Sequence, residues 1–176
     1  MSLAYKDEYI PRYTYDDYKN WEGKWEIING IAYAISPAPV IKHQEISGNI
    51  YMQLKQKSKD CKNCKSLQAV DWKIDEKTTI CPDNLLVCGT EIGDKYLTKT
   101  PSIIFEILSP STAFKDKNVK FQLYESKGVK YYIIVDGTKE TAEIFELYNK
   151  KYQKTKNNRF ILEGCEIDFD FENIWS

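Results

Sequence analysis

The chain has 176 residues, 42% of them hydrophobic and 29% charged, which is the composition of an ordinary soluble globular protein with enough length for one domain and its core. The formal net charge of −1 gives no sign of a polyanionic partner. No apolar run is long enough to span a bilayer, and the first residues do not resemble a signal segment, so we expect a cytoplasmic protein that does not bind a membrane.

Charge is distributed less evenly along the chain than its total suggests. Residues 53–65 contain five lysines and one acid, and residues 149–159 contain four lysines and one arginine with no acid. Residues 163–172 reverse the sign with five acids. Runs of this kind are typical of solvated surfaces, and the two basic runs are also candidates for contacts with phosphate groups.

The first elements predicted from the sequence are a short helix and a hairpin. Residues 13–21 (YTYDDYKNW) predict a helix, with Thr14 as its N-cap and Asp17 in the capping-box position. Residues 24–36 alternate apolar and polar side chains around Asn29-Gly30, which is a strong hairpin signal.

A helix and three strands are expected next. The Ser-Pro-Ala-Pro segment at 36–39 breaks the chain, and residues 40–59 have the apolar spacing of a helix with a lysine-rich last turn. Strands are predicted near 66–74, 79–88 and 102–108.

The remaining residues predict a helix and a series of strands. Residues 111–128 predict a helix closed by glycine, and residues 129–136 predict a buried strand. A hairpin is expected over 141–155, and residues 159–171 are expected to finish the sheet. The order of elements indicates one α/β domain with a mixed sheet flanked by helices.

Several familiar catalytic motifs are absent from the sequence. It has no glycine-rich phosphate loop, dinucleotide fingerprint, GxSxG or HExxH, and we expect no small-molecule cofactor. The single histidine, His43, has no second histidine with which to share a metal. A lone histidine on a helix is more often structural or exposed than functional, so we favour a structural or surface position for His43.

The five cysteines argue against a disulfide framework in a chain without an export signal. The CKNC segment contains Cys61 and Cys64 at the spacing of metal ligands, and Cys81 and Cys88 are candidates to complete a zinc site. Small buried apolar side chains are the favoured interpretation of the latter two, because both lie in strand-like runs.

Two acids stand where apolar residues are expected. Glu106 interrupts the apolar run IIFEIL, and Asp83 follows Pro82 in TICPDNLLVC. An unpaired buried carboxylate costs several kcal/mol, roughly, because it loses its hydration. If the two strands are neighbours, Asp83 and Glu106 converge, and two close carboxylates need a proton or a cation between them. Mg²⁺ or Mn²⁺ suits such an oxygen site.

Each of these acids also has a simpler explanation. Asp83 could cap a turn, and Glu106 could pair with a buried lysine. Lys120 is a candidate because Asp116, Lys120 and Tyr124 form a stripe on a helix that is apolar on two sides, although an exposed Asp116–Lys120 pair is also possible. Glu26 opens the first hairpin, where either exposed alternation or support of a metal site accounts for it.

These segments together resemble the Uma-two family of restriction endonucleases, a branch of the PD-(D/E)XK nuclease superfamily. The resemblance covers about residues 13–140. It is carried by YTYDDY, WEIINGIAYAISPAP, HQEISGNI, CPDNLLVC, PSIIFEILSPST, the D…K…Y stripe and GVKYYIIVD. It implies a restriction-endonuclease-like fold, with residues 1–176 as a single nuclease-like domain.

The resemblance also implies roles for individual residues. Asp83 matches the motif aspartate and Glu106 the (D/E) position, so both would hold Mg²⁺ or Mn²⁺, together with a backbone carbonyl near residue 107. Leu108 stands where the superfamily has lysine, and Lys120 would supply that lysine from the next helix. Glu26 matches the acidic position before the hairpin. His43 and Gln44 match a His-Gln pair without an assigned role.

The function implied by the resemblance is metal-dependent hydrolysis of DNA phosphodiester bonds, with a homodimer suited to cutting both strands. The basic runs would bind the nucleic-acid backbone. The alternatives are a catalytically idle nucleic-acid-binding or scaffold protein on the same fold, and a nuclease acting on RNA or damaged ends.

Overall fold

The computed structural model of the chain describes residues 10–35 and 40–175, so the predicted break at 36–39 lies outside the described residues. The elements are, in chain order, α1 (Tyr15–Tyr18), β1 (Trp25–Ile28), β2 (Ile31–Ala34), α2 (Ile41–Lys57), β3 (Cys64–Gln68), β4 (Trp72–Asp75), β5 (Thr78–Ile80), β6 (Asn84–Cys88), β7 (Ile103–Ile107), η2 (Lys115–Lys120), α3 (Phe121–Lys127), β8 (Tyr131–Asp136), β9 (Thr141–Tyr148), β10 (Lys151–Thr155), β11 (Arg159–Leu162), β12 (Cys165–Asp168) and η3 (Glu172–Ile174).

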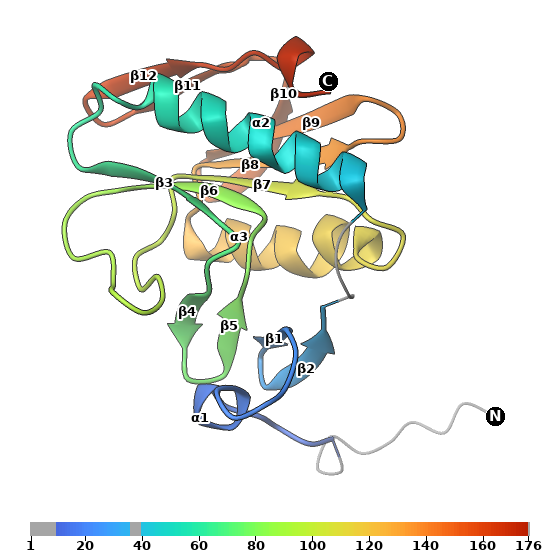
Figure 1. Cartoon of the computed structure of the whole chain (residues 1–176). Helices are drawn as coiled ribbons and strands as arrows, with labels where there is room; N and C mark the ends of the chain where they lie inside the picture. The colour runs from blue at the N-terminus through green and yellow to red at the C-terminus, as the bar shows by residue number, and fades with distance from the viewer. Residues whose placement is uncertain (1–9, 36–39, 176) are drawn as a thin grey trace.

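A six-stranded mixed sheet forms the centre of the fold, with strand order β10-β9-β8-β7-β6-β3. The β7–β8 pair is parallel and the other pairs are antiparallel. The chain crosses from β7 to β8 through η2 and α3, which lie against one face, while α2 lies across the other (Figure 1). The predicted mixed α/β architecture with flanking helices is confirmed.

Two apolar clusters fill the spaces on the two sides of this sheet. Beneath α2, Ile46 and Leu54 pack against Phe105 and other side chains of the same face. On the opposite face, Ile104 packs with Tyr124 of α3. Because side chains alternate along a strand, Glu106 projects to the same face as Ile104, toward η2 and α3. This alternation fixes which helix can supply a partner for Glu106.

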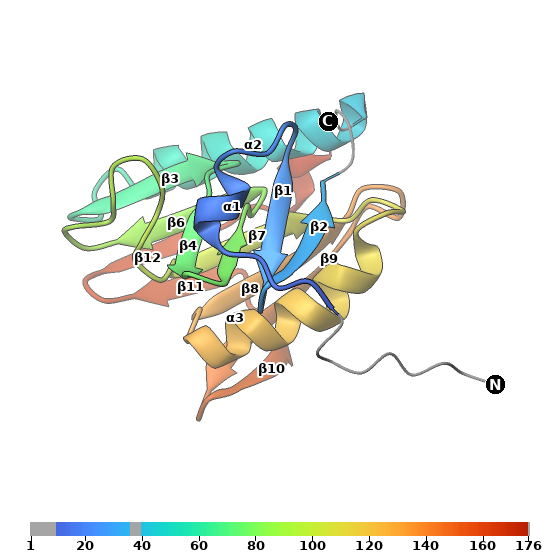
Figure 2. The ribbon, with the colours of Figure 1, turned by 90° about the horizontal axis from the view of Figure 1, so that it is seen from below.

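A second sheet, of order β2-β1-β5-β4, lies below the α3 side of the central sheet in Figure 1 and in front of it in Figure 2, which is seen from below. The predicted hairpin is confirmed: Asn29 and Gly30 have φ values of 52° and 81°, the left-handed pair that a tight turn requires. The predicted capping box is also present, and the Thr14 backbone N–H donates to Asp17 Oδ2 at 2.8 Å.

Two predicted strands are each broken in two, which corrects their expected extent. The strand expected over 66–74 divides into β3 and β4 at Ala69, whose φ of 47° turns the chain. The strand expected over 79–88 divides into β5 and β6 at Pro82, which has no N–H to donate to a ladder. Each break passes the chain between the two sheets, so the apolar pattern continues while the pairing partner changes.

The C-terminal hairpin does not finish the central sheet, as the sequence led us to expect. Strands β11 and β12 form a two-stranded sheet of their own. Their apolar side, including Phe160 and Ile167, packs on the α2 side of the central sheet, in the cluster of Phe105. Strands β11 and β12 lie beside α2 (Figure 1), and burial of their apolar side chains, not hydrogen bonding to a strand of the central sheet, holds them there.

The helix expected over 111–128 contains a π-helical segment, η2, before α3 begins. Gly128 closes α3 in the left-handed conformation, as predicted, with a φ of 79°. Along this helix Phe114 is 76% exposed, whereas the Phe121 ring contacts the Phe145 ring edge to face at a centroid distance of 5.0 Å. Wider π-helical turns rotate the side chains on either side of η2 relative to an α-helix.

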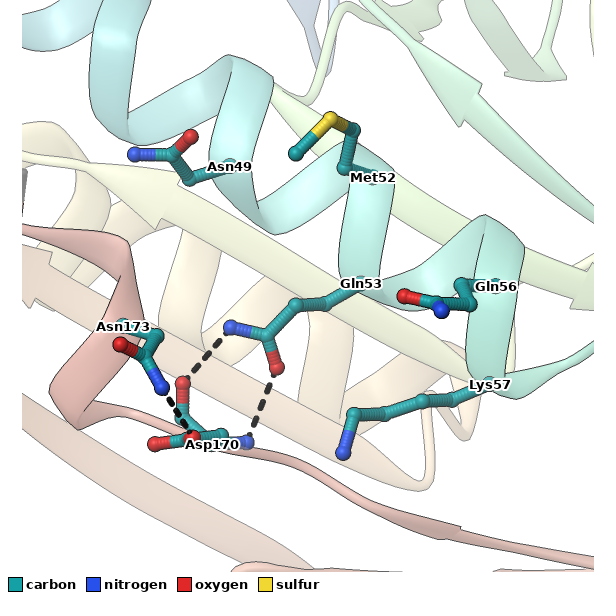
Figure 3. A pocket seen from close by; sticks show the side chains of 7 residues that line it. All are labelled: Asn49, Met52, Gln53, Gln56, Lys57, Asp170 and Asn173. Atoms are coloured by element: carbon teal, nitrogen blue, oxygen red, sulfur yellow. Dashed lines mark hydrogen bonds between the residues drawn. The ribbon is translucent and has the colours of Figure 1, made fainter.

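The second half of α2 is held against the segment that follows β12. Gln53 Nε2 donates to the Asp170 carbonyl at 2.7 Å, and the Asp170 N–H donates to Gln53 Oε1 at 3.0 Å. Figure 3 shows these bonds in a shallow polar hollow that Lys57 and Asn173 also line. Its polar side chains serve to dock the C-terminal segment. Among the described helices, none is long and apolar enough to cross a membrane.

Two disulfides join four of the five cysteines, contrary to the expectation of no disulfide framework. Cys64 and Cys88 face each other across the β3–β6 pair and are bonded, and Cys61 is bonded to Cys165. The second pair is separated by 104 residues, so its proximity depends on the whole fold. Cys81, considered above as a possible partner of the CKNC segment, has a free thiol and belongs to neither pair.

Candidate active site

Asp83 and Glu106 lie side by side at one end of the central sheet. The register pairs Asn84 with Phe105, so the preceding and following residues, Asp83 and Glu106, come next in the ladder. Glu106 is 2% exposed. The Ile107 backbone N–H donates to Asp83 Oδ2 at 2.8 Å, which fixes the Asp83 carboxylate against the end of β7. The expected convergence of the two strands is therefore present.

Lys120 lies within the group of acids and is 3% exposed. Its Nζ is 2.9 Å from Glu106 Oε1 and 2.8 Å from Glu26 Oε1. Asp116 Oδ1 is farther away, at 3.6 Å. The alternative of an exposed Asp116–Lys120 pair is wrong, because both side chains are buried. Lys120 therefore reaches the position beside Glu106 from η2 rather than from β7.

Glu26 enters the cluster from β1 and is 1% exposed, so exposed alternation does not explain it. The Cys81 backbone N–H donates to Glu26 Oε1 at 3.0 Å. Lys115 Nζ binds Glu26 Oε2. One buried carboxylate thus holds Lys115, Lys120 and the chain just before Pro82.

Two buried tyrosines complete the wall of the cluster. Tyr124 Oη donates to Glu106 Oε1 at 2.6 Å, and Tyr132 Oη donates to the Asp116 carbonyl at 2.9 Å. Both hydrogen bonds that Glu106 accepts from described side chains fall on Oε1. Oε2 therefore remains as the oxygen with which Glu106 could bind a ligand.

His43 approaches Asp83 from the first turn of α2. Its Nε2 is 3.4 Å from Asp83 Oδ2, and its side chain is 15% exposed. Its Nδ1 is buried without a hydrogen-bond partner among the described residues. His43 is thus partly buried beside a carboxylate. The neighbouring Gln44 is exposed.

Burial and charge act in opposite directions on these groups. Burial raises the pKa of Glu106 well above its usual value, because Asp116, Asp83 and Glu26 add to it and the opposing effect of Lys120 is smaller. Burial would also raise the pKa of Glu26, but Lys120 and Lys115 outweigh it and the pKa is lowered. The Lys120 pKa is raised well above its usual value by the surrounding carboxylates, despite burial.

The cluster therefore places Lys115 and Lys120 among more carboxylates than they can neutralise. The carboxylates are those of Glu26, Asp83, Glu106 and Asp116. Burial, together with repulsion from the other carboxylates, raises the Glu106 pKa, and a bound cation would favour the ionised form. Hard divalent cations prefer such carboxylate oxygens, so the donor set fits Mg²⁺ or Mn²⁺.

The positions of these oxygens limit how far that fit extends. Within the described ranges, the group of three or more ligand atoms lying within 4.8 Å of one another is formed by cysteine sulfurs, not by these carboxylates. Lys120 Nζ lies beside Glu106 Oε1 at ion-pair distance. The geometry thus contains the buried Glu106–Lys120 pair and offers Asp83 and Glu106 Oε2 as candidate ligands, without a third side-chain ligand atom grouped this closely with them among the described residues.

The two lysine-rich runs do not surround the cluster. His43 marks the end of α2 near Asp83, and Lys57 is 14 residues further along, or about 21 Å at the rise of an α-helix. The second run, around the β9–β10 turn at 149–150, is also far from the cluster. The start of β9 is at the Glu106 end of the sheet, because Thr141 pairs with the last residue of β8, and the turn follows Tyr148 at the other end of β9. A role of these runs in binding a substrate at Glu106 is therefore not supported by position.

Lys115 and Tyr132 belong to the cluster but were not singled out in the sequence. Lys115 adjoins Asp116 in a lysine-rich stretch, where an exposed side chain is the usual expectation. Its contact with Glu26 spans 89 residues. The π-helical turns of η2 bring Lys115 and Lys120 to the same carboxylate, and the sequence gives no local signal for that geometry.

Comparisons with known proteins agree with this fold. A family model described as "Uma2: Putative restriction endonuclease" matches residues 12–164. The chain therefore belongs to the Uma2 family, and the resemblance inferred from the sequence is confirmed. No curated protein matches the chain.

A solved structure with the same fold is that of a protein named as a putative nuclease belonging to DUF820, from Anabaena variabilis ATCC 29413. The TM-score is 0.72 and the sequence identity 13%, with 92% of this chain and 97% of that chain covered. At this identity, the likeness shows the fold. The restriction-endonuclease-like α/β fold expected from the sequence is confirmed.

Proposed function

We propose that this protein is a divalent-metal-dependent endonuclease that hydrolyses DNA phosphodiester bonds. The observation that carries the proposal is the place where the start of β6 lies beside the end of β7. Asp83 and Glu106 are neighbours there, and Lys120 Nζ is 2.9 Å from Glu106 Oε1. Two carboxylates can hold a divalent metal ion, and an adjacent ammonium group can offset charge that develops on a phosphate. Membership of a family described as restriction endonucleases supports the same chemistry.

In this proposal, Asp83 and Glu106 hold Mg²⁺ or Mn²⁺. When bound, such an ion polarises the scissile phosphate and lowers the pKa of an attacking water molecule. The Ile107 N–H and His43 hold Asp83 in place, and the Tyr124 hydroxyl holds Glu106 by Oε1, leaving Oε2 free to bind. The protein thus orients both carboxylates before a ligand arrives.

In this proposal, Lys120 would supply a second positive charge beside the reacting phosphate, in addition to the metal ion. Its raised pKa keeps the ammonium group protonated, so it would orient water or offset the negative charge that develops on the phosphate. Glu26 is a positioning residue in this account, because it binds Lys120 and Lys115 at the same carboxylate. Loss of Glu26 would leave both lysines without their shared partner.

A catalytically idle protein on the same fold is the second candidate. The observation that favours it is the buried Glu106–Lys120 pair, which satisfies part of Glu106 without any metal. Such a protein would retain the cluster as a structural element and bind nucleic acid or another partner without cleaving it. The two candidates differ in whether Glu106 is needed for hydrolysis.

Nicking of supercoiled plasmid DNA distinguishes them. We expect the wild-type protein to nick plasmid in Mg²⁺ or Mn²⁺ but not in EDTA, and Glu106→Ala and Asp83→Ala to be inactive while their circular dichroism is retained. Glu143→Ala is the control, since Glu143 pairs with Lys154 on the exposed surface. Equal residual activity in Glu106→Ala and wild type would refute a catalytic role for the cluster. A single-stranded RNA of matched length tests the alternative substrate.

The proposal extends to the assembly and setting of the protein. We propose that residues 1–176 act as a single cytoplasmic nuclease domain that pairs into a homodimer, because a two-fold dimer places two sites on the two strands of a duplex. Sedimentation equilibrium in the concentration range of the nicking assay measures the assembly. A monomer at all active concentrations would contradict it.

A further inference from the structure

Four cysteines meet at the end of the central sheet remote from Glu106. Cys64 begins β3 and Cys88 ends β6, five residues or about 17 Å of strand beyond Asp83. Cys61 lies in the turn before β3, and Cys165 begins β12. These residues join three separate parts of the chain at one point, so a ligand held there would tie the C-terminal hairpin to the sheet.

Three of the four sulfurs are close enough to share one ion. Sγ atoms of Cys61, Cys64 and Cys165 all lie within 4.8 Å of one another. Cys88 Sγ is bonded to Cys64 Sγ and lies outside this close group. In a tetrahedral zinc site with Zn–S bonds of about 2.3 Å, neighbouring sulfurs are about 3.8 Å apart. Side-chain rotation of the reduced cysteines, with the larger movement at Cys88, would bring all four sulfurs to this spacing.

The backbone of the CKNC turn is fixed by hydrogen bonds. Asn63 has a φ of 57°, and the Cys64 N–H donates to the Cys61 carbonyl at 3.3 Å. The Gly89 N–H donates to the Asn63 carbonyl at 2.8 Å, which joins the turn to the end of β6. These bonds hold Cys61, Cys64 and Cys88 together by a means other than the disulfides. The reduced chain would thus retain the arrangement of these thiols.

Part of the lysine-rich run 53–65 lies beside the cysteines. A hollow beside it is lined by Lys55, Lys59 and Lys65 together with Cys61 and Cys64. Four thiolates around a divalent ion have a net charge of −2, and nearby ammonium groups stabilise both the thiolates and the charged complex. The carboxylate site does not account for the position of these lysines, whereas a negatively charged metal–thiolate complex beside them would.

We propose that, when both disulfides are reduced, Cys61, Cys64, Cys88 and Cys165 bind one Zn²⁺ ion as a structural site. Reduction by a dithiol gives each disulfide two electrons and two protons, and the dithiol becomes its own disulfide. Binding then releases the four thiol protons to solvent as four Zn–S bonds form, with no further change in oxidation state. The site is independent of the proposed nuclease chemistry.

Cobalt titration of the dithiol-reduced, desalted full chain tests the proposal under anaerobic conditions. We expect thiolate-to-cobalt charge-transfer absorption and the intense visible bands of tetrahedral Co²⁺, saturating at one equivalent and abolished by Zn²⁺. Cys88→Ser and Cys165→Ser should lose most of the charge-transfer intensity. Cys81→Ser is the matched control, because its free thiol belongs to neither pair, and it should retain the spectrum. Asp83→Ala should retain it too.

A measurement on the wild-type chain covers the case in which a serine variant does not fold. Zn²⁺ should protect the four proposed ligands against alkylation, as mapped by mass spectrometry, and should raise the Tm of the reduced protein. Absence of charge-transfer absorption in the reduced wild type would overturn the proposal. So would protection that leaves any of the four ligands as reactive as in the zinc-free chain, or an undiminished spectrum in both serine variants.

Discussion

Replacing Lys120 by methionine removes the positive charge from the centre of the carboxylate cluster while keeping a side chain of similar length. Lys120 is 3% exposed and lies 2.8 Å from Glu26 and 2.9 Å from Glu106. Breaking a buried ion pair by removing one partner costs about 3–5 kcal/mol, because the other charge is left uncompensated. For a chain of this size, that corresponds to a fall in Tm of roughly 6–20 °C.

The loss should depend on pH in a defined direction. Without Lys120, the folded-state pKa values of Glu106 and Asp116 rise further above their unfolded ones, because the charge that chiefly opposes burial and mutual repulsion is gone. The variant's stability relative to wild type should therefore be highest below the ordinary carboxyl pKa and should fall as pH rises. Protonation of Glu26, Glu106 and Asp116 offsets the missing ammonium group at low pH.

Urea denaturation in EDTA from pH 4 to pH 8 measures this difference. Lys154→Met is the matched control: its partner Glu143 is on the surface, and the pair is 62% and 38% exposed. Its loss should cost no more than about 1 kcal/mol. Equal stabilities of Lys120→Met and Lys154→Met, or a Lys120→Met deficit that shrinks with rising pH, would refute the account of the buried cluster.

Three further predictions concern the site and the backbone. Burial, aided by neighbouring carboxylates, raises the Glu106 pKa. In EDTA, the wild type should therefore lose stability relative to Glu106→Gln as pH rises from about 4.5. A difference in free energy of unfolding that does not change with pH, measured by urea denaturation, would contradict this. Gly30→Ala, at a φ of 81°, should lower the free energy of unfolding by about 1–2 kcal/mol, whereas Gly48→Ala, within α2 and with open space around it, should raise it by about 0.5–1 kcal/mol. His43→Ala should reduce nicking about 10–100-fold with Tm little changed, if its role is to position Asp83; unchanged nicking would exclude that role.

Local patterns in the sequence predicted the frame of the site well. The acid within IIFEIL indicated a buried carboxylate, and the Pro82 break directed attention to Asp83 at the adjoining strand end. Both inferences depend on alternation along strands and on the missing N–H of proline, which are local properties. The Asp116–Lys120–Tyr124 stripe likewise indicated which side chains could face Glu106, and all three do lie in its surroundings.

Features that depend on tertiary closure were not predictable in the same way. Burial of Glu26 requires the hairpin to pack over η2, and its alternating sequence is equally typical of an exposed strand. The π-helical turns that bring Lys115 to Glu26 leave no periodic signal. Cys165 lies 104 residues from Cys61, so its place beside the CKNC turn follows from the docking of the C-terminal hairpin and not from spacing.

The cation that neutralises Glu106 is the central question for this protein. The most direct measurement is anomalous diffraction from a crystal grown with Mn²⁺. The density to inspect lies where the start of β6 meets the end of β7, between Asp83 and Glu106. The account predicts a Mn²⁺ peak bound by Asp83 and by Glu106 Oε2, at about 2.0–2.3 Å from each, with Lys120 Nζ still beside Oε1. A structure with no ion there at millimolar Mn²⁺, and with the Glu106–Lys120 pair unchanged, would contradict it.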